Sequence, residues 1–366
     1  MTTPFQTPFG DFTLQCDNAT DPSIQAWNQA DCYLLNLFAQ HDFSDNDKLA
    51  VVNDDWGALA LGTAQFQPEI YSDSAIFSYW LGINCKKDKP LVQPIENISN
   101  STANIILMRL PKNLHFFRHQ LSLLSFLPDI TLYIAGMQKY WPASFFEATH
   151  DYFADVEIFP GVKKAKAICL KRGKSNPEPA TTTVLELPEF HLKTVNYPNV
   201  FSRENLDIGT RFFLENFPDL NYCHTVLDLA CGNGLLGIQA LKQHPELQGW
   251  FVDESWYATQ SCRDSLKAND IKENRYEVTQ NNILHNLPLP PMDAILCNPP
   301  FHQQHRIGDH IASVMIKQSK NALKKGGCLY LIGNRHLNYQ LLLRQSFKHV
   351  EIYASNNKFL IFKSIQ

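Results

Sequence analysis

Hydrophobic and polar positions in the second half of the chain alternate between short apolar runs and longer amphipathic stretches. The short runs predict strands at Thr225–Leu229, Gly249–Val252, Tyr276–Thr279, Ala294–Cys297, Cys328–Gly333, His349–Tyr353 and Lys358–Lys363. The longer stretches predict helices at Leu235–Gln243, Ser255–Asn269 and Ile311–Leu323. Such alternation predicts an α/β fold whose mostly parallel sheet is covered on both faces, with the last two strands forming an antiparallel hairpin.

The first half of the chain repeats the second half in four short segments that occur in the same order. The matched pairs are Val51–Gly57 with Val226–Gly232, Asn104–Met108 with Asp293–Cys297, Ile130–Gly136 with Gly327–Gly333, and Val156–Ile158 with Val350–Ile352. Their offsets are 175, 189, 197 and 194 residues. The conserved order and similar spacing predict that the protein contains two copies of one α/β domain.

Prolines mark the boundary between the two copies. Pro177, Pro179 and Pro188 fall within 15 residues, and proline opposes helix formation. The sequence therefore predicts a first domain over residues 1–175, a linker over 176–190 and a second domain over 191–366.

Composition excludes several classes of protein. The 366 residues are 44% hydrophobic and 19% charged, which predicts full cores and excludes a disordered chain. No apolar run approaches the roughly 20 residues of a membrane helix, and the first residues resemble no signal peptide. The nine cysteines include no Cys-x-x-Cys pair, so they predict reduced thiols and a cytoplasmic protein that contacts no membrane.

The net charge of −4 divides unevenly along the chain. Residues 1–190 carry 14 Lys and Arg against 21 Asp and Glu, while the remainder carries 18 against 15. The net charges of −7 and +3 fit either ordinary surface variation or a second half that tolerates nucleic acid. The overall acidity means that any nucleic-acid binding must use local basic patches.

A glycine-containing turn between a strand and a helix is the first candidate for chemistry. Gly232, Asn233 and Gly234 follow the strand that contains Asp228, and glycines let a ligand approach the backbone closely. An acidic group repels phosphate and attracts a cation, which favours S-adenosylmethionine over a dinucleotide. A purely structural turn is the other explanation, because a lone glycine-rich turn is a weak signal.

Two later strands end in polar residues that fit the same ligand. Asp253 ends the next strand about 20 residues on, where a carboxylate can accept hydrogen bonds from a ribose. Asn281 and Asn282 follow the third strand, where a side-chain amide can bind an adenine edge.

The most specific signal is Asn298-Pro299-Pro300-Phe301, directly after the apolar run that ends at Cys297. An amino group conjugated to a ring is a poor nucleophile. The Asn298 side-chain oxygen and the Pro299 carbonyl can both accept hydrogen bonds from one NH2 group and so direct its lone pair at a methyl donor. The prolines stiffen these acceptors and Phe301 offers a face for stacking, so catalysis by positioning is predicted.

Together these motifs resemble those of class I S-adenosylmethionine-dependent methyltransferases that act on planar amino groups. Four short segments narrow the resemblance to the ribosomal RNA guanine-N2 methyltransferases with two tandem domains. These segments are 201–203, 206–211, 298–305 and 334–337. The resemblance is nearest to the members that act on 23S large-subunit RNA, and the 16S members are relatives. One departure is Ala230, which stands where the motif usually has glycine.

The resemblance implies two Rossmann-like domains, of which the first is a degenerate copy that helps to bind RNA. It implies N2-methylation of a guanine in 23S rRNA, with S-adenosylmethionine as co-substrate and without a metal. It further implies that Phe201, Arg203 and Asp207 close the donor site from the start of the second domain. Protein-free rRNA as the substrate and a monomeric enzyme complete this expectation.

The residues of the first copy support the expectation of a degenerate site. By the matched segments, Gly57-Ala58-Leu59 stands opposite Gly232-Asn233-Gly234. Arg109-Leu110-Pro111-Lys112 stands opposite Asn298-Pro299-Pro300-Phe301, so both acceptors are lost and two cations replace them. Arg109 and Lys112 are therefore predicted to contact RNA phosphates.

Three weaker candidates remain. Six cations between Lys163 and Lys174 fit either a solvated strand edge or a patch for the RNA backbone. His302, His305 and His310 have no acidic or thiol residue at a spacing that suits metal binding, so a metal site is not expected. His302 and His305 are instead predicted to shape the pocket for the target base. Arg335 follows the fifth strand and fits either an RNA contact or a cap on that strand.

Other functions use the same four residues from Asn298 to Phe301. These alternatives are methylation of 16S rRNA guanine N2, of adenine N6 in DNA, or of a protein glutamine amide. The large first half favours a nucleic-acid substrate over a protein. An RNA-binding ribosome-assembly factor with a vestigial enzyme domain is the non-enzymatic alternative, and the intact motifs after residue 196 oppose it.

Overall fold

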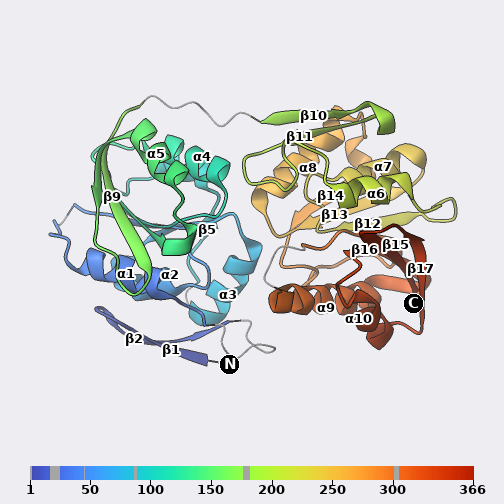
Figure 1. Ribbon diagram of the computed structural model, residues 1–366, viewed down its shortest axis with the longest axis horizontal. Helices are drawn as coiled ribbons and strands as arrows, with labels where there is room; N and C mark the ends of the chain where they lie inside the picture. Colours follow the sequence, from blue (N-terminus) through green and yellow to red (C-terminus); the bar gives the residue numbers. More distant parts are fainter. Residues whose placement is uncertain (1, 17–24, 45, 86–88, 176–181, 301–304) are drawn as a thin grey trace. The chain divides into compact units, whose positions relative to one another are not determined.

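A computed structural model describes residues 2–16, 25–44, 46–85, 89–175, 182–300 and 305–366, and of residues 305–309 only the backbone. The chain divides into two compact units, Met1–Thr181 and Thr182–Gln366, which are called unit 1 and unit 2 (Figure 1). Each unit is described by itself.

Unit 2 is a seven-stranded sheet flanked by helices, with a separate hairpin at its start. The strands are β10 (Thr183–Leu187), β11 (Leu192–Asn196), β12 (Thr225–Leu229), β13 (Gln248–Asp253), β14 (Tyr276–Gln280), β15 (Met292–Cys297), β16 (Leu323–Asn334), β17 (His349–Ser355) and β18 (Phe359–Ile365). The helices are α6 (Ile208–Glu215), α7 (Leu235–Gln243), α8 (Trp256–Ala268), α9 (His305–Ala322) and α10 (Tyr339–Ser346), with short 3-10 turns η4 (Pro188–Phe190) and η5 (Glu273–Arg275).

The strand order of the unit 2 sheet is β14-β13-β12-β15-β16-β18-β17. All neighbouring strands are parallel except the β16–β18 and β17–β18 pairs. The predicted α/β fold and the antiparallel hairpin at the chain end are therefore confirmed. Helix α9 begins at His305, six residues before the predicted start, because Ile307 is the one apolar residue among the first six of the helix.

Unit 1 has the same architecture. Its strands are β1 (Thr2–Thr7), β2 (Gly10–Gln15), β3 (Leu49–Val52), β4 (Glu69–Tyr71), β5 (Val92–Gln93), β6 (Ile105–Arg109), β7 (Thr131–Met137), β8 (Phe153–Ile158) and β9 (Ala165–Gly173). Its helices are α1 (Gln29–Ala39), α2 (Ala58–Gly62), α3 (Ala75–Cys85), α4 (Leu114–Leu124) and α5 (Ala143–Tyr152), with 3-10 turns η1 (Ala64–Phe66), η2 (Ile95–Asn100) and η3 (Gln138–Tyr140).

The duplication inferred from the sequence is visible in the topology. The unit 1 sheet has the order β5-β4-β3-β6-β7-β9-β8, which is the unit 2 order strand for strand. In both sheets only the last two pairings are antiparallel. Each unit also begins with a separate antiparallel hairpin, β1–β2 or β10–β11.

That second hairpin changes the boundary expected from the prolines. Strand β10 and turn η4 lie within residues 176–190, the stretch expected to be a linker. Pro188 starts the 3-10 turn of the hairpin, where proline needs no hydrogen-bonded N–H. Residues 183–190 therefore belong to unit 2.

The strand pairing also corrects the first of the four matched segments. Leu49 pairs with Ile105 in unit 1, and Val226 pairs with Ala294 in unit 2. Since Ile105 corresponds to Ala294 by the second match, Leu49 corresponds to Val226, and the first offset is 177 rather than 175. The apolar pattern alone could not distinguish these two registers, because they differ by two residues and the side chains of a strand repeat every two residues.

Backbone angles agree with the corrected register. Asn53 and Ala230 have φ of 59° and 58°, and Gly57 and Gly234 have φ of 95° and 85°. The two members of each pair are 177 residues apart. The turns after β3 and β12 thus share these two left-handed positions, whereas Gly232 has a third one that Asp55 lacks.

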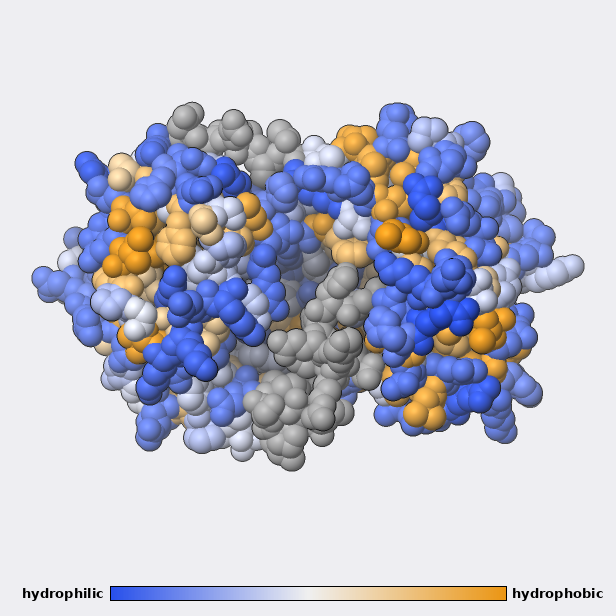
Figure 2. Space-filling view, in the orientation of Figure 1, coloured by the Kyte–Doolittle hydropathy of each residue, from blue (hydrophilic) through white to orange (hydrophobic). Residues whose placement is uncertain are grey.

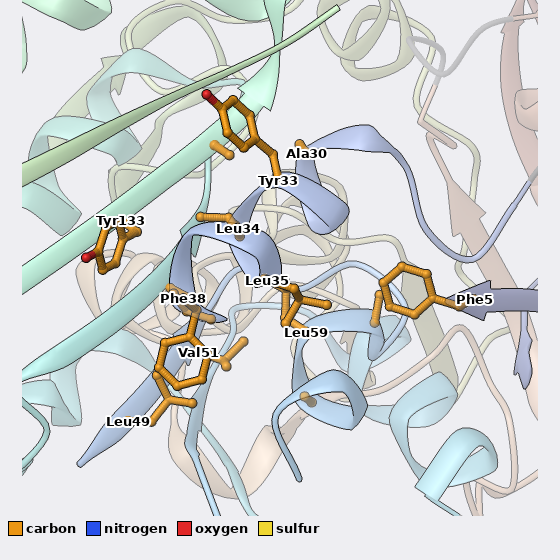
Figure 3. Packing of buried hydrophobic residues seen from close by; sticks show 14 of the residues in the cluster. Phe5, Ala30, Tyr33, Leu34, Leu35, Phe38, Leu49, Val51, Leu59 and Tyr133 are labelled. Atoms are coloured by element: carbon orange, nitrogen blue, oxygen red, sulfur yellow. The ribbon is translucent and has the colours of Figure 1, made fainter. Parts of the chain in front are cut away.

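Alternate strand residues pack on opposite faces of the unit 2 sheet. Val226 and Leu296 belong to the core on the side of α7, whereas Leu227 and Ile295 belong to the core on the side of α9. In unit 1, Phe5 of β1, Phe38 of α1, Val51 of β3 and Leu59 of α2 share one core (Figure 3). Both units therefore bury enough apolar surface to form cores of their own.

The visible surface of each unit is mostly hydrophilic, with hydrophobic side chains in small separate groups (Figure 2). Over the described parts of the chain, no helix has the length and apolar character needed to cross a bilayer.

Candidate active site

The turn between β12 and α7 creates an open space beside the backbone. Gly232 has a φ of 55°, and a Cβ placed there would have no atom within 4 Å. At Gly234, which begins α7, a Cβ would lie only 2.7 Å from the Sγ of Cys262. Gly234 therefore permits close packing beneath the turn, while Gly232 leaves room above it for a ligand. Ala230, the departure from the usual glycine, adopts a φ of 58° in the same turn.

Asp228 lies beneath this turn and is almost completely buried. Its Oδ2 accepts a hydrogen bond from the backbone N–H of Gly237 in the first turn of α7, at 2.8 Å. Burial, with a smaller contribution from the nearby Asp253, raises the pKa of Asp228 to about 8. A cationic ligand above the turn would favour the ionised form.

Asp253 holds the turn from the end of β13. Its Oδ2 accepts from the N–H of Gly232 at 2.8 Å, and its Oδ1 accepts from the N–H of Ser255 at 3.0 Å. Burial raises the pKa of Asp253. Each oxygen has a second lone pair, so the carboxylate can also accept from hydroxyl groups of a ligand in the space beside Gly232.

The two asparagines expected to bind adenine differ in their surroundings. The Nδ2 of Asn281 donates to the carbonyls of Ile283 and His285, at 3.2 and 3.1 Å. Asn281 therefore closes its own loop with its NH2 group, and the binding of adenine by its side-chain amide stays a prediction. Asn282 is half-buried next to it and keeps that role as a prediction.

Asn233 connects the turn to the start of unit 2. Its Nδ2 donates to the Oδ1 of Asn196 at 2.9 Å, and the Nδ2 of Asn196 donates in turn to the backbone carbonyl of Arg203 at 3.0 Å. Asn196 is fully buried and was not among the residues singled out in the sequence. Nothing local in the sequence marked it, because its partner Asn233 is 37 residues away.

Asn298 stands at the carboxyl end of β15, beside the end of β12 that leads into the turn. Its Nδ2 donates to the Oγ1 of Thr210 in α6, at 2.9 Å. Its Oδ1 is buried and accepts no hydrogen bond from any residue that the structure describes. Pro299 is buried and Pro300 is exposed. The free acceptor at Asn298 is the feature that the predicted chemistry requires.

Asp207 is the N-cap of α6. Its Oδ2 accepts from the backbone N–H of Thr210 at 2.8 Å and lies 3.3 Å from the Oγ1 of Thr210. A Cβ at Gly209 would come within 3.0 Å of the same Oδ2. The structure thus joins Asp207 to Asn298 through Thr210, a residue that the sequence analysis did not single out.

The remaining predicted residues around the site are placed as follows. The side chain of Phe201 is exposed, and Arg203 follows it within the same loop. The exposed Arg335 donates from its Nε to the carbonyl of Asn356, which fits the strand-capping interpretation and leaves its terminal nitrogens available. Phe301 and His302 lie outside the described residues, as does the side chain of His305.

The equivalent site of unit 1 is filled. By the corrected register, Asp55, Trp56 and Gly57 stand opposite Gly232, Asn233 and Gly234, which replaces the earlier assignment of Gly57-Ala58-Leu59. The Oδ2 of Asp54, one residue earlier, accepts from the N–H of Ala60 at 2.9 Å. This is the amide that corresponds to Gly237, so a carboxylate still caps the helix although it comes from a different position.

Arg109 does not lie on the surface, which corrects the prediction that it contacts RNA. It is 9% exposed, its Nη1 contacts the buried Oδ1 of Asp31, and its Nη2 lies 3.2 Å from Asp55. A buried guanidinium needs such partners because desolvation penalises an unpaired charge. Asp31 is the third residue of α1, just as Thr210 is the third residue of α6.

Lys112 is exposed, in contrast to Arg109. Its Nζ lies 5.8 Å from the ring centre of Tyr140, and the Nζ of the exposed Lys139 lies 4.7 Å from the same ring. Lys112 follows β6 and Tyr140 follows β7, so these three residues gather at the carboxyl edge of the unit 1 sheet. They are called the Tyr140 cluster.

The described residues contain no group of three or more metal-ligating side chains. Within them, the site in unit 2 offers an open backbone, two carboxylates and one free amide oxygen. These groups can bind a ligand that combines a positive charge with hydroxyl groups, and can orient a second ligand that carries an amino group.

Family comparisons agree with the division into two units. Residues 2–175 match the family model described as the RLMG N-terminal domain, and residues 191–363 match the methyltransferase small domain.

Proteins of the same length resemble the chain from end to end. It is 35% identical over 371 residues to the ribosomal RNA large subunit methyltransferase G of Ectopseudomonas mendocina, with 98% of this chain and 99% of the relative covered. It is 33% identical to the protein of that name from Pseudoalteromonas translucida, with coverage of 93% and 92%.

Among solved structures, a T. thermophilus 16S rRNA N2 methyltransferase in complex with AdoMet and guanosine has a TM-score of 0.79 and covers 100% of this chain and 98% of its own. Its identity of 16% means that this likeness concerns the fold.

Proposed function

The chain belongs to the ribosomal RNA large subunit methyltransferase G family, and on that premise we propose that it transfers a methyl group from S-adenosylmethionine to N2 of a guanine in 23S rRNA. The observation that carries the chemistry is the free, buried Oδ1 of Asn298 at the carboxyl edge of the unit 2 sheet. The related fold that holds both AdoMet and guanosine supports guanine N2 as the acceptor.

The donor fits the space beside Gly232. S-adenosylmethionine supplies an activated methyl group on a positively charged sulfur. Asp228 and the N-terminus of α7 lie beneath this space, and Asp253 offers carboxylate oxygens at its rim. Asn233 keeps the turn attached to Asn196 and the loop that contains Arg203. Phe201 and Asn282 complete the proposed donor site.

Asn298 and Pro299 position the acceptor amine. One N–H of the guanine amino group donates to the Asn298 Oδ1 and the other donates to the Pro299 carbonyl, which turns the nitrogen lone pair toward the methyl group. The new N–C bond forms as the S–C bond breaks. The nitrogen then loses one proton to water, which leaves a secondary amine. The two acceptors stabilise the positive charge that develops on nitrogen.

The target guanine must leave any base stack to reach these acceptors. Phe301 is proposed to stack on the base, with Pro300 stiffening the loop and His302 and His305 shaping the pocket. Arg335, whose terminal nitrogens remain available, is proposed to contact the RNA backbone.

Unit 1 is proposed to bind RNA rather than the donor. The Tyr140 cluster combines an aromatic face with two exposed cations, which is the combination that stacks an unpaired base and neutralises phosphates. Lys112 keeps its proposed role, and Lys139 takes the place expected of Arg109. Protein-free rRNA as substrate, a monomer and a cytoplasmic location belong to the same proposal.

Transfer of labelled methyl to unmethylated large- and small-subunit rRNA tests this function. Wild type is expected to label only large-subunit RNA, as N2-methylguanine, and Asn298→Ala is expected to abolish the label. Asn338→Ala is a matched control, because Asn338 is exposed and its side chain caps nothing. Label in small-subunit RNA, in adenine or in protein would instead support one of the alternative substrates.

A further inference from the structure

Asn298 can act only if its oxygen, and not its nitrogen, faces the acceptor amine. The two ends of a side-chain amide have the same shape, so a half-turn would present an NH2 group to the guanine amino group. Two donors facing each other form no hydrogen bond. The site therefore needs a device that fixes the orientation of the amide.

The hydrogen bonds of Thr210 provide such a device. Asp207 Oδ2, 3.3 Å from the Thr210 Oγ1, belongs to a carboxylate that can only accept, so the Thr210 hydroxyl donates its one hydrogen to Asp207. The Thr210 Oγ1 is then an acceptor toward Asn298. It receives the Nδ2–H of Asn298 at 2.9 Å, which leaves the buried Asn298 Oδ1 without a partner among the described residues.

From this directional chain we infer that Thr210 is a positioning residue for methyl transfer: it fixes the side-chain amide of Asn298 so that Oδ1 faces the guanine amino group. This inference rests on the proposed function. Thr210 is buried and is held by α6, whose N-cap Asp207 also accepts the backbone N–H of Thr210. The donor-to-acceptor direction of the hydrogen bonds from Asn298 through Thr210 to Asp207 is therefore fixed, because the Asp207 carboxylate cannot donate.

Unit 1 shows what the same two positions do without this constraint. Asp31 stands at the Thr210 position and Arg109 at the Asn298 position, and they form a buried ion pair. The pair joins the same helix to the same strand. Both units therefore have a polar side-chain contact between this helix and this strand. In unit 1 the contact is an ion pair, and in unit 2, which carries the intact motif, it is a hydrogen bond between a hydroxyl and an amide.

Kinetics of Thr210→Val separate positioning from donor binding. The variant keeps the shape of the side chain but loses both hydrogen bonds of the hydroxyl. We expect kcat at saturating donor to fall by about 10- to 100-fold, the scale of a misplaced catalytic group. The dissociation constant for S-adenosylmethionine should stay unchanged. Thr210→Ser, which restores the hydroxyl, should restore kcat.

A double-mutant cycle tests whether Thr210 acts through Asn298. In an Asn298→Ala background, Thr210→Val should cause no further fall in kcat, because the amide that it orients is gone. An equal fall in both backgrounds, a wild-type kcat for Thr210→Val, or a weakened donor affinity with normal kcat would each overturn the inference. If Thr210→Val fails to fold, Thr210→Ala carries the same expectations.

A measurement without substrate keeps this inference separable from the proposed function. With 15N-labelled asparagine, the side-chain amide signals of Asn298 are identified by their absence from Asn298→Ala. One amide hydrogen of Asn298 should exchange slowly with water in wild type and in Thr210→Ser, and rapidly in Thr210→Val. Equal exchange in all three proteins would contradict the hydrogen bond, even if no RNA is methylated. Slow exchange in an enzyme that methylates no RNA would instead contradict the proposed function.

Discussion

Units 1 and 2 share one topology and two left-handed positions in the turn after β3 or β12, yet they differ at the polar positions around that turn. From unit 2 to unit 1, the replacements are Asp228 by Val51, Gly232 by Asp55, Asn233 by Trp56, Asp253 by Ser72, Thr210 by Asp31 and Asn298 by Arg109. The strand order and the left-handed positions at Asn53 and Gly57 survive these changes. The fold therefore depends on buried apolar strands, and the site depends on a few residues that the fold does not require.

The buried groups of unit 1 show how a site is replaced rather than merely lost. Simple loss of the Asn298 side chain would leave the Thr210 hydroxyl without the amide that donates to it. In unit 1, Arg109 instead fills this position and pairs with Asp31 and Asp55. The buried guanidinium thus has two carboxylate partners, and this part of unit 1 has become a structural element.

The largest contrast is expected between Asn298→Ala and Arg109→Ala. Loss of one preorganised polar group at the reacting atom lowers kcat by about 10²- to 10³-fold, and Asn298→Ala should do so with a small change in stability. Arg109→Ala should leave kcat unchanged but lower the free energy of unfolding by about 3–5 kcal/mol, because Asp31 remains buried without its partner. Urea unfolding and single-turnover kinetics measure the two effects. A strong loss of kcat in folded Arg109→Ala would contradict this division of roles.

Much of this comparison could be predicted from the sequence, and the exceptions have physical causes. Strand β12 and helix α7 have the predicted bounds, because their apolar periodicity is decided locally. The two-residue shift at Val51 was invisible because strand side chains repeat every two residues, so a shift of two leaves each side chain of β3 on the same face.

The burial of Arg109 could not be foreseen either. Its partner Asp31 is 78 residues away, and nothing local joins them. The motif at Asn298 was recognised from sequence, but Thr210, 88 residues earlier, becomes part of the site only when α6 packs beside β15. Long-range pairs such as these are what a single sequence conceals.

A change at the turn should alter donor binding in unit 2 alone. Gly232→Leu places a side chain in the open space above the turn, and we expect the dissociation constant for S-adenosylmethionine to rise at least about tenfold, or 1.4 kcal/mol. The left-handed φ of 55° adds about 1–2 kcal/mol of strain to the folded state. Asp55→Leu, the matched change in unit 1, should leave donor affinity unchanged. Calorimetric titration of both variants provides the measurement, and an effect of Asp55→Leu on donor affinity would indicate that unit 1 binds the donor.

A change in unit 1, in contrast, is expected to alter the affinity for RNA. Lys112→Glu combined with Lys139→Glu reverses both cations of the Tyr140 cluster, so RNA affinity should fall by about tenfold at low salt and its salt dependence should become shallower. Lys48→Glu is the control, because Lys48 precedes β3 at the amino edge of the same sheet and its Nζ donates to Thr102. Filter binding at two salt concentrations would measure the effect. If the double variant and Lys48→Glu weaken binding equally, the Tyr140 cluster has no special role.

The smallest expected effect concerns a proton. Both units bury a carboxylate against the same helix amide, with pKa values raised to about 8 for Asp228 and about 7 for Asp54. At pH 7 Asp228 is mostly protonated in the free protein. A cationic donor above it favours the ionised form, so donor binding should release up to about one proton.

Calorimetry in buffers of different ionisation enthalpy would count this proton. Asp228→Asn should abolish the release, whereas Asp54→Asn should leave it intact, because unit 1 is not expected to bind the donor. The same raised pKa has a consequence for folding. A carboxyl group that keeps its proton in the folded state makes stability decline as pH rises from about 4 toward the folded pKa, by up to about 1.4 kcal/mol per pH unit. Both variants should reduce that decline. The two carboxyl groups would then have similar effects on protein stability and would differ only in proton release on donor binding. Release of the same number of protons by Asp228→Asn and wild type would place the donor away from Asp228.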